Sequence, residues 1–329
     1  MPTASDLGER ALIQRITARL AAPAWVVVGP GDDAAVVEPQ RRTLDVLTTD
    51  AQVEGVHFDH RFMPPDAIGH RALAVNLSDL AAMGARPRVA LLSLVLPGAL
   101  DVSVVDGLMD GMLRVADAHR VAIVGGNISR SPGPMMIDVT AVGSIGRRRV
   151  LTRRGARPGD IVYVTGTIGD AAAGLESLRA GADVQVGPTE QRFLYPEARV
   201  RAGMLLASNR AATACMDLSD GLADGVRQIA EASGVGIAID AERLPVTEDV
   251  RRWHETHGRR PLDAALAGGD DYELLFTVRP THQGRLRAVK RLLGTLPLTR
   301  IGVVTRDRAI IVTYADGVRE LPPGFEHFS

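Results

Sequence analysis

The chain has 329 residues, 46% of them hydrophobic, and a formal net charge of −1. This length suits two domains of ordinary size. No apolar run reaches the 18 residues of a membrane span, and the near-neutral charge gives no reason to expect a nucleic acid or an anionic membrane as partner.

The cysteine content bears on the cellular compartment of the protein. Cys215 is the only cysteine, which excludes an internal disulfide and a multi-cysteine metal site. The first ten residues, MPTASDLGER, lack the basic and apolar regions of a secretory signal. We therefore expect a protein of the reducing cytoplasm.

The first half of the chain is predicted to alternate between helices and strands. Apolar residues at three- and four-residue spacing predict a helix over 6–21. A second helix is expected from Asp66, as N-cap, to Gly84, and a third over 101–119. Strands are expected over 25–28, 43–48, 89–97, 121–126 and 136–146.

An Arg-, Gly- and Pro-rich stretch over 147–160 is the predicted junction between a domain of residues 1–147 and one of residues 148–329. Beyond it, Gly169-Asp170 is expected to open an Ala-rich helix. Strands are expected over 161–166, 215–219, 235–240 and 271–278. Alternating strands and helices in both halves predict an α/β fold, or α+β layers.

The scarcity of lysine excludes two phosphate-binding architectures. Lys290 is the only lysine, and it lies in an expected amphipathic helix without a Gly-rich loop before it. A P-loop and a protein kinase each need a lysine beside the phosphates. Neither architecture is therefore expected here.

Five short motifs carry clustered acidic residues, four of them at expected strand or glycine-turn ends. They are Gly31-Asp32-Asp33, Thr48-Thr49-Asp50, Asn76 with Asp79, Asp217-Leu218-Ser219-Asp220, and Gly269-Asp270-Asp271. Taken singly, each motif is a weak signal: Gly31-Asp32-Asp33 fits an ordinary polar loop, and Asp220 alone fits a helix N-cap, although capping does not explain Asp217. Asp79 falls in an apolar helix, where it needs a cation, an arginine partner or solvent.

Taken together, these carboxylates would repel one another strongly without cations. Carboxylates and Thr hydroxyls without a Cys or His cluster favour Mg²⁺, which proteins usually share with substrate phosphates. Gly125-Gly126-Asn127 follows a strand and could bind a polyphosphate through backbone amides. Arg153 is either a further phosphate donor or a solvated linker charge.

These motifs together resemble the thiamine-monophosphate kinases of the AIR-synthase-like superfamily. The matching segments are GDDAAV (31–36), TTDAQVEGVHF (48–58), ALAVNLSDLAAMGARP (72–87), VGGNISRS (124–131), LTRRGARPGD (151–160), MDLSDGLADG (216–225), GGDDYELLFT (268–277) and GFEHF (324–328). They follow the family order over nearly the whole chain.

The resemblance implies a two-domain AIR-synthase-like fold, with a homodimer formed by the N-terminal sheets and the nucleotide between the domains. It implies transfer of the terminal phosphoryl group of ATP to thiamine monophosphate, the final step of thiamine diphosphate biosynthesis. Several Mg²⁺ ions would be held by Asp33, Thr48, Thr49, Asp50, Asp79, Asp217 and Asp220, of which Asp50, Asp217 and Asp220 would be catalytic. ATP would contact Gly126, Asn127, Arg153 and Ser219, and thiamine monophosphate would contact His57, Asp270 and Phe325.

The acceptor in such a reaction is a phosphate oxygen, already largely ionised at neutral pH because its second pKa is ~6. No general base is needed, so we expect direct transfer with His57 as a substrate contact rather than a phosphoryl carrier. Phe325 either stacks on the thiamine rings or anchors the C-terminus.

Two residues depart from the commonest family pattern: Asn127 where Asp is common, and Asp270 where Glu is usual. They leave open a non-catalytic nucleotide-binding protein of the same fold. Aminoimidazole ribonucleotide synthetase is a further alternative, although the GGDDYELLFT and GFEHF segments argue against it.

Overall fold

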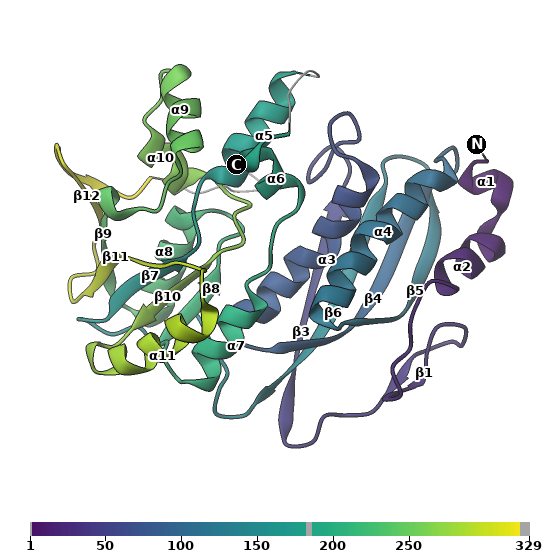
Figure 1. Cartoon of the computed structure of the whole chain (residues 1–329), viewed down its shortest axis with the longest axis horizontal. Coiled ribbons are helices and arrows are strands. Elements are labelled where there is room, and N and C mark those ends of the chain that lie inside the picture. The colour runs from purple at the N-terminus through teal and green to yellow at the C-terminus, as the bar shows by residue number, and fades with distance from the viewer. Residues whose placement is uncertain (1, 182–185, 323–329) are drawn as a thin grey trace. The chain divides into compact units, whose positions relative to one another are not determined.

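The computed structural model describes residues 2–181 and 186–322. The chain folds into two compact units. The first consists of Met1–Leu80 with Arg86–Arg147, and the second of Ala81–Ala85 with Arg148–Ser329. Each unit has its own main sheet and its own helices (Figure 1).

The first unit is built on a four-stranded sheet of order β3-β6-β4-β5. Only β4 and β5 run parallel, joined through α4 as a β-α-β crossover. The strands of this unit are β1 (Val26–Val28), β2 (Val36–Val37), β3 (Thr43–Val53), β4 (Arg86–Pro97), β5 (Ala122–Ser131) and β6 (Met136–Gly146). The helices are α1 (Ala4–Leu7), α2 (Glu9–Thr17), α3 (Pro65–Ala82) and α4 (Val102–His119).

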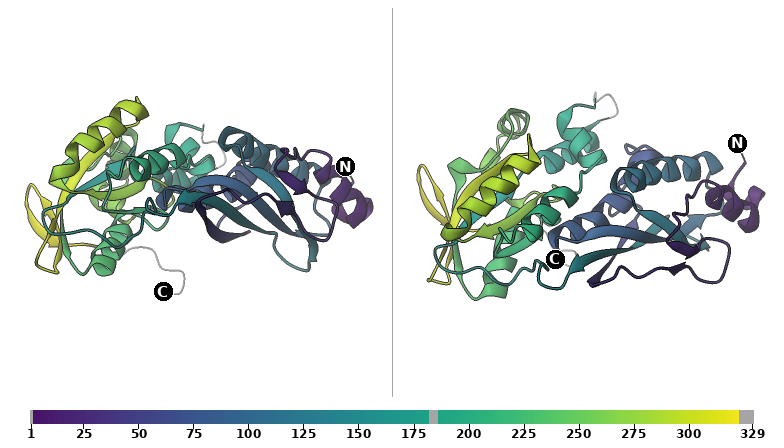
Figure 2. Two further views of the ribbon diagram at one scale, coloured as in Figure 1. Left: turned by 90° about the horizontal axis from the view of Figure 1, so that it is seen from below. Right: turned by 60° about the horizontal axis from the view of Figure 1, so that its bottom comes forward.

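Helices α3 and α4 lie against each other on one face of this sheet (Figure 2). Two glycines allow the close approach. A Cβ on Gly69 of α3 would lie 1.9 Å from the Leu108 carbonyl oxygen, and one on Gly111 of α4 would lie 1.8 Å from that of Asp66. Since a side chain cannot fit at either position, the close packing of α3 against α4 requires glycine at both.

The second unit is built on a seven-stranded sheet of order β13-β12-β9-β11-β7-β10-β8, antiparallel except where β12 pairs with β9. Its strands are β7 (Ile161–Thr165), β8 (Ala214–Asp217), β9 (Gly236–Asp240), β10 (Leu274–Val278), β11 (Leu298–Thr305), β12 (Ile310–Tyr314) and β13 (Gly317–Glu320). Its α-helices are α5 (Asp170–Ala180), α6 (Pro188–Leu194), α7 (Val200–Ser208), α8 (Leu222–Ser233), α9 (Glu248–Thr256), α10 (Pro261–Ala267) and α11 (Gln283–Leu293). Two 3-10 helices, Ala241–Arg243 and Pro280–His282, complete it.

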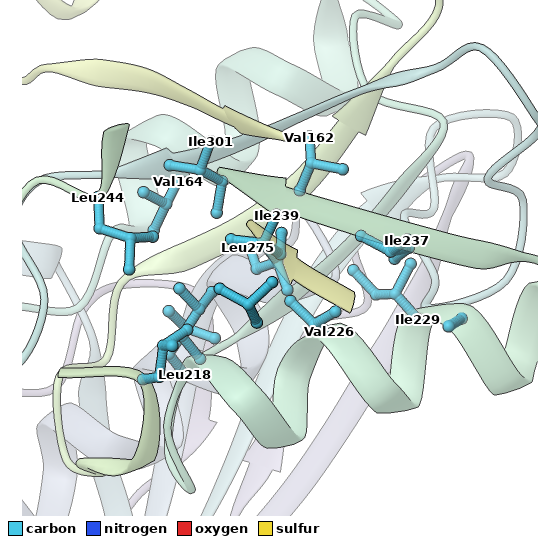
Figure 3. Close-up of a cluster of buried hydrophobic side chains, with 14 of the residues drawn as sticks. Val162, Val164, Leu218, Val226, Ile229, Ile237, Ile239, Leu244, Leu275 and Ile301 are labelled. Atoms are coloured by element: carbon cyan, nitrogen blue, oxygen red, sulfur yellow. The ribbon is translucent and has the colours of Figure 1, made fainter. Parts of the chain in front are cut away.

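The core of the second unit lies between this sheet and the apolar face of α8. Val226 and Ile229 project from the helix toward Ile237, Ile239 and Leu275 of the strands (Figure 3). All five side chains are fully buried. Their spacing follows the helix period on one side and the strand period on the other.

The structure confirms the expected α/β fold and corrects several bounds. The first helix is present, but its expected bounds of 6–21 are wrong, because Gly8 takes φ +79° and separates α1 from α2, and α2 ends at Thr17. Helix α3 begins at Pro65, so Asp66 lies in its first turn and is not the N-cap. Strands β3 and β5 extend five residues beyond the predicted 48 and 126, to Val53 and Ser131. Strand β10 begins only at Leu274, after a turn described below. Within the described ranges, no helix is both long and apolar enough to cross a membrane.

Candidate functional site

A cavity of about 920 Å³ lies in the first unit. Its walls come from α2, from the loop over 29–35, and from strands β4, β5 and β6. Three predicted site residues line it: Asp33, Gly126 and Asn127. The volume falls within the range of small-molecule sites. The structure therefore brings the predicted carboxylate loop and the predicted phosphate loop to one cavity.

The predicted ligands Thr48, Thr49 and Asp50 lie on strand β3, and their side chains lie on two different faces of the sheet. The Thr48 hydroxyl donates to the Asp79 carboxylate of α3. Asp50 shares this face with Thr48, because strand side chains alternate. The Thr49 hydroxyl instead lies 3.1 Å from an Asp138 carboxylate oxygen on β6. We expected all three at a strand end. That is wrong, because β3 continues to Val53 in register with β6.

The cavity contains a further carboxylate, that of Asp138, which was not predicted from the sequence. Ser93 of β4 pairs with Asp138 on one side and with Asn127 of β5 on the other. Directly paired residues share a face, so the three polar side chains form one row across the sheet. The alternation of Met136, Asp138 and Thr140 with buried residues of β6 is the signal that could have found it.

Gly126 is expected to be intolerant of a side chain. Its Cβ would lie 1.9 Å from the backbone oxygen of Leu92, whereas a Cβ on Gly125 would meet only the Leu91 side chain, at 3.4 Å. We expect Gly126→Ala to force β5 away from β4 and to cost about 1–3 kcal/mol in urea unfolding. It should also weaken binding of an ATP analogue in calorimetry. Gly125→Ala is the matched control and should stay within about 0.5 kcal/mol of wild type. Equal behaviour of the two variants would contradict this prediction.

His57 lies in the loop after β3, and a hydrogen bond indicates the tautomer of its neutral ring. The Val53 backbone N–H donates to His57 Nδ1 over 3.1 Å. Because Nδ1 accepts, the neutral ring carries its proton on Nε2. In this tautomer the donor of the ring is its Nε2–H group.

In the second unit, strand β8 ends at Asp217, which is 5% exposed. The Ser219 hydroxyl, two residues on, donates to the Asp220 carboxylate over 3.2 Å. The alternative role of Asp220 as a helix cap is wrong, because the N-cap of α8 is Gly221 at φ +94°. These three polar residues thus occupy one strand-to-helix turn at the carboxyl end of β8.

Residues 270–273 form a turn beside Ser219. The Asp270 N–H donates to the Ser219 carbonyl over 2.7 Å, and the Leu218 N–H donates to the Glu273 carbonyl over 2.9 Å. The structure thereby brings the predicted substrate contact Asp270 next to the predicted ATP contact Ser219. Burial raises the pKa of Asp271, within this turn, well above its usual value.

A buried ion cluster that was not predicted from the sequence anchors the same turn. Glu273 is fully buried and accepts from Arg192, Arg199 and Thr165 at 2.5–2.7 Å. Burial alone would lower the pKa of Arg199, but its bonds to Glu273 raise it above its ordinary value. The cluster therefore holds its charges as an ion pair network. Arg199 and Glu273 lie 74 positions apart in the sequence, so no local sequence pattern predicts that they pair.

Two predicted residues remain, Arg153 and Phe325. Arg153 is exposed in a loop of the second unit, and Phe325 lies outside the described residues. In the part of the chain that the structure describes, no group of three or more His, Cys, Asp or Glu side chains is placed to hold a metal ion. The predicted metal ligands are divided between the two units: Asp33, Thr48, Thr49, Asp50 and Asp79 in the first, Asp217 and Asp220 in the second.

Comparison with known proteins defines the class. Residues 31–145 match the family described as AIR synthase related protein, N-terminal domain, and residues 157–315 match AIR synthase related protein, C-terminal domain. The chain is therefore an AIR synthase related protein with both domains of that class. HypE, a hydrogenase maturation protein, shares the fold with a TM-score of 0.78 at 22% identity, covering 97% of this chain and 96% of that one.

Relatives within the class narrow the assignment. Thiamine-monophosphate kinase of Aquifex aeolicus is 38% identical over 98% of this chain and 99% of its own length, and that of Escherichia coli K12 is 37% identical over 98% of each. A solved structure, AaThiL complexed with AMPPCP and TMP, has a TM-score of 0.78 at 37% identity, covering 100% of this chain and 99% of that one. The chain belongs to the thiamine-monophosphate kinase family.

Proposed function

We propose that the chain transfers the terminal phosphoryl group of ATP to thiamine monophosphate, giving ADP and thiamine diphosphate. The observation that carries this proposal is the full-length similarity to AaThiL, whose structure contains AMPPCP and TMP. The cavity that Asp33, Gly126 and Asn127 line supports it, since all three lie in the segments GDDAAV and VGGNISRS that carry the resemblance to the family.

Mg²⁺ is the proposed cofactor, in several ions. The donors fit it, because carboxylate and hydroxyl oxygens are the hard ligands that Mg²⁺ prefers. The Thr48 hydroxyl and the Asp79 carboxylate are already in contact. We assign the ions to the set named from the sequence: Asp33, Thr48, Thr49, Asp50, Asp79, Asp217 and Asp220. Bound Mg²⁺ would neutralise the phosphates of both substrates and hold them for in-line transfer.

The protein side of the mechanism consists of binding and orientation. Gly126 and Asn127 would bind the ATP phosphates from the cavity wall, with Ser219 and Arg153 as further donors. His57, Asp270 and Phe325 would hold thiamine monophosphate. Because the acceptor oxygen is already ionised near neutral pH, no side chain needs to remove a proton from it.

His57 is expected to act through its Nε2–H donor alone. Glutamine can place an amide N–H near that position, so His57→Gln should retain the KM for thiamine monophosphate within about threefold. His57→Ala should raise KM roughly tenfold or more, the scale of one hydrogen bond to a charged group. Steady-state kinetics measures both. Phosphate trapped on His57 by rapid quenching would show a phosphoenzyme and contradict direct transfer.

We also propose a homodimer formed by the face of the first sheet that α3 and α4 do not cover. Leu47 and Met136 alternate onto this face and are 70% and 38% exposed. Sedimentation should give a dimer for the wild type and a monomer for Leu47→Glu. Val318→Glu, at a 60% exposed position of the second unit, is the control and should remain dimeric.

The proposed location is the reducing cytoplasm. The single cysteine, Cys215, is buried and free, which supports this proposal.

The test of the function is direct. The purified protein is incubated with MgATP and thiamine monophosphate, and thiamine diphosphate is sought by mass spectrometry. Product should form only with Mg²⁺ and the monophosphate, and unphosphorylated thiamine should give none. ADP without thiamine diphosphate would indicate another acceptor. ATP binding without turnover would instead favour a nucleotide-sensing protein.

A further inference from the structure

The turn over 270–273 contains two residues in a conformation that few non-glycine residues adopt. Asp270 has φ +67° and Tyr272 has φ +50°, both in the left-handed region. Such residues cost conformational energy and persist only where the surrounding structure enforces them. Two of them separated by one residue mean that this backbone is held firmly in place.

Three hydrogen bonds enforce the turn. The Asp270 and Tyr272 N–H groups donate to the carbonyls of Ser219 and Leu218, at 2.7 and 2.9 Å. Between them, the Asp271 side chain is 2% exposed and accepts from the Gly169 N–H over 2.8 Å. The buried Glu273 cluster follows directly. The backbone that carries Asp270 and Tyr272 is therefore fixed on both sides.

The Tyr272 hydroxyl makes a defined contact with Asp270. It donates to Asp270 Oδ1 over 3.0 Å, and the tyrosine is only 7% exposed. An aspartate on a fixed backbone can still rotate about its side-chain bonds, and a hydrogen bond from a buried phenol restricts that rotation.

We propose that Tyr272 is a positioning residue, which orients the Asp270 carboxylate for the phosphorylated acceptor. The inference rests on the proposed function, in which Asp270 contacts thiamine monophosphate. Tyr272 acts through Asp270 and need not touch the substrate. Its loss should therefore weaken acceptor binding while the phosphoryl-transfer step proceeds at its usual rate.

The test is Tyr272→Phe, which removes one oxygen and keeps the ring packing. We expect KM for thiamine monophosphate to rise roughly tenfold, with kcat within twofold and the affinity for AMPPCP unchanged. Calorimetry with thiamine monophosphate should show the same loss of binding. Tyr314→Phe is the matched control, because Tyr314 is 6% exposed and its hydroxyl donates to Asp263 over 2.5 Å in the same unit. It should leave KM unchanged.

A double-mutant cycle identifies the route of the effect. Asp270→Asn should raise KM, and adding Tyr272→Phe to it should raise KM no further, since the group that Tyr272 orients has already been altered. If Tyr272→Phe leaves KM within twofold while Asp270→Asn raises it, the inference fails and the proposed function stands. An equal rise for Tyr314→Phe, or full additivity in the cycle, also overturns it. If Asp270→Asn has no effect on KM, the assignment of Asp270 to the acceptor fails and the inference fails with it.

Discussion

Replacing Asp217 by asparagine is expected to reduce kcat/KM by roughly 10²–10³-fold, the scale of losing one electrostatic stabiliser of a transition state. Asp217 ends β8 and is nearly buried, opposite Leu274 in the register of β10. An amide keeps the shape of the carboxylate but removes its charge, so it cannot balance a divalent cation. Steady-state assays with MgATP and thiamine monophosphate measure the loss.

Binding provides a second readout that does not depend on turnover. Calorimetry with AMPPCP should show a Mg²⁺-dependent affinity that Asp217→Asn weakens. Asp240→Asn is the control, because Asp240 also ends a strand of this unit but pairs at the surface with Arg243. It should retain full activity and binding. Wild-type activity in Asp217→Asn would remove this residue from the proposed metal ligands.

Replacing Glu273 by alanine is expected to lower the free energy of unfolding by about 3–5 kcal/mol, because it leaves Arg199 and Arg192 without their buried partner. Glu273 is 0% exposed and Arg199 is 9% exposed in their ion pair, so water cannot fully solvate the charge that remains. Urea unfolding followed by far-UV circular dichroism measures the loss. The turn carrying Asp270 should also loosen, since Glu273 anchors it.

Glu176→Ala is the matched control for this effect. Glu176 pairs with Arg259 in the same unit, but both side chains are about 40% exposed. A pair that solvent screens in this way typically contributes ~0–1 kcal/mol. A loss below 1 kcal/mol for Glu273→Ala, or equal losses for the two variants, would show that the buried cluster contributes little to stability.

How far the sequence predicts this fold depends on the kind of signal. Strand β6 was predicted with its observed bounds, Met136–Gly146, because polar and apolar residues alternate along it. The start of β10 was predicted three residues early, at 271. Periodicity carries no information about the left-handed φ values of Asp270 and Tyr272, which delay the strand. The length of β3 was underestimated because a Thr-Thr-Asp run resembles a strand end.

In the candidate site, too, residues in local motifs were predicted, whereas contacts between residues far apart in the sequence were not. Asp33 and Asn127 were found from glycine-rich turns, which are local in sequence. The contact of Thr48 with Asp79 joins residues 31 positions apart, and that of Arg199 with Glu273 joins residues 74 apart. Pairings at such separations depend on the tertiary fold, so composition and spacing could name the individual residues but not their partners.

The strand order of the second sheet has a consequence for how the chain folds during synthesis. Strand β7 lies between β10 and β11, and Ile161 pairs with Val278 on one side and Val303 on the other. As the chain leaves the ribosome, β7 emerges before either neighbour exists, and β3 of the first sheet likewise emerges before β6, the strand with which it pairs. Long loops must close before such distant pairs form, which slows folding. Each unit therefore passes through a stage in which an early strand has no hydrogen-bonding partner, and in the second unit this strand is the apolar β7, which a chaperone would protect from aggregation.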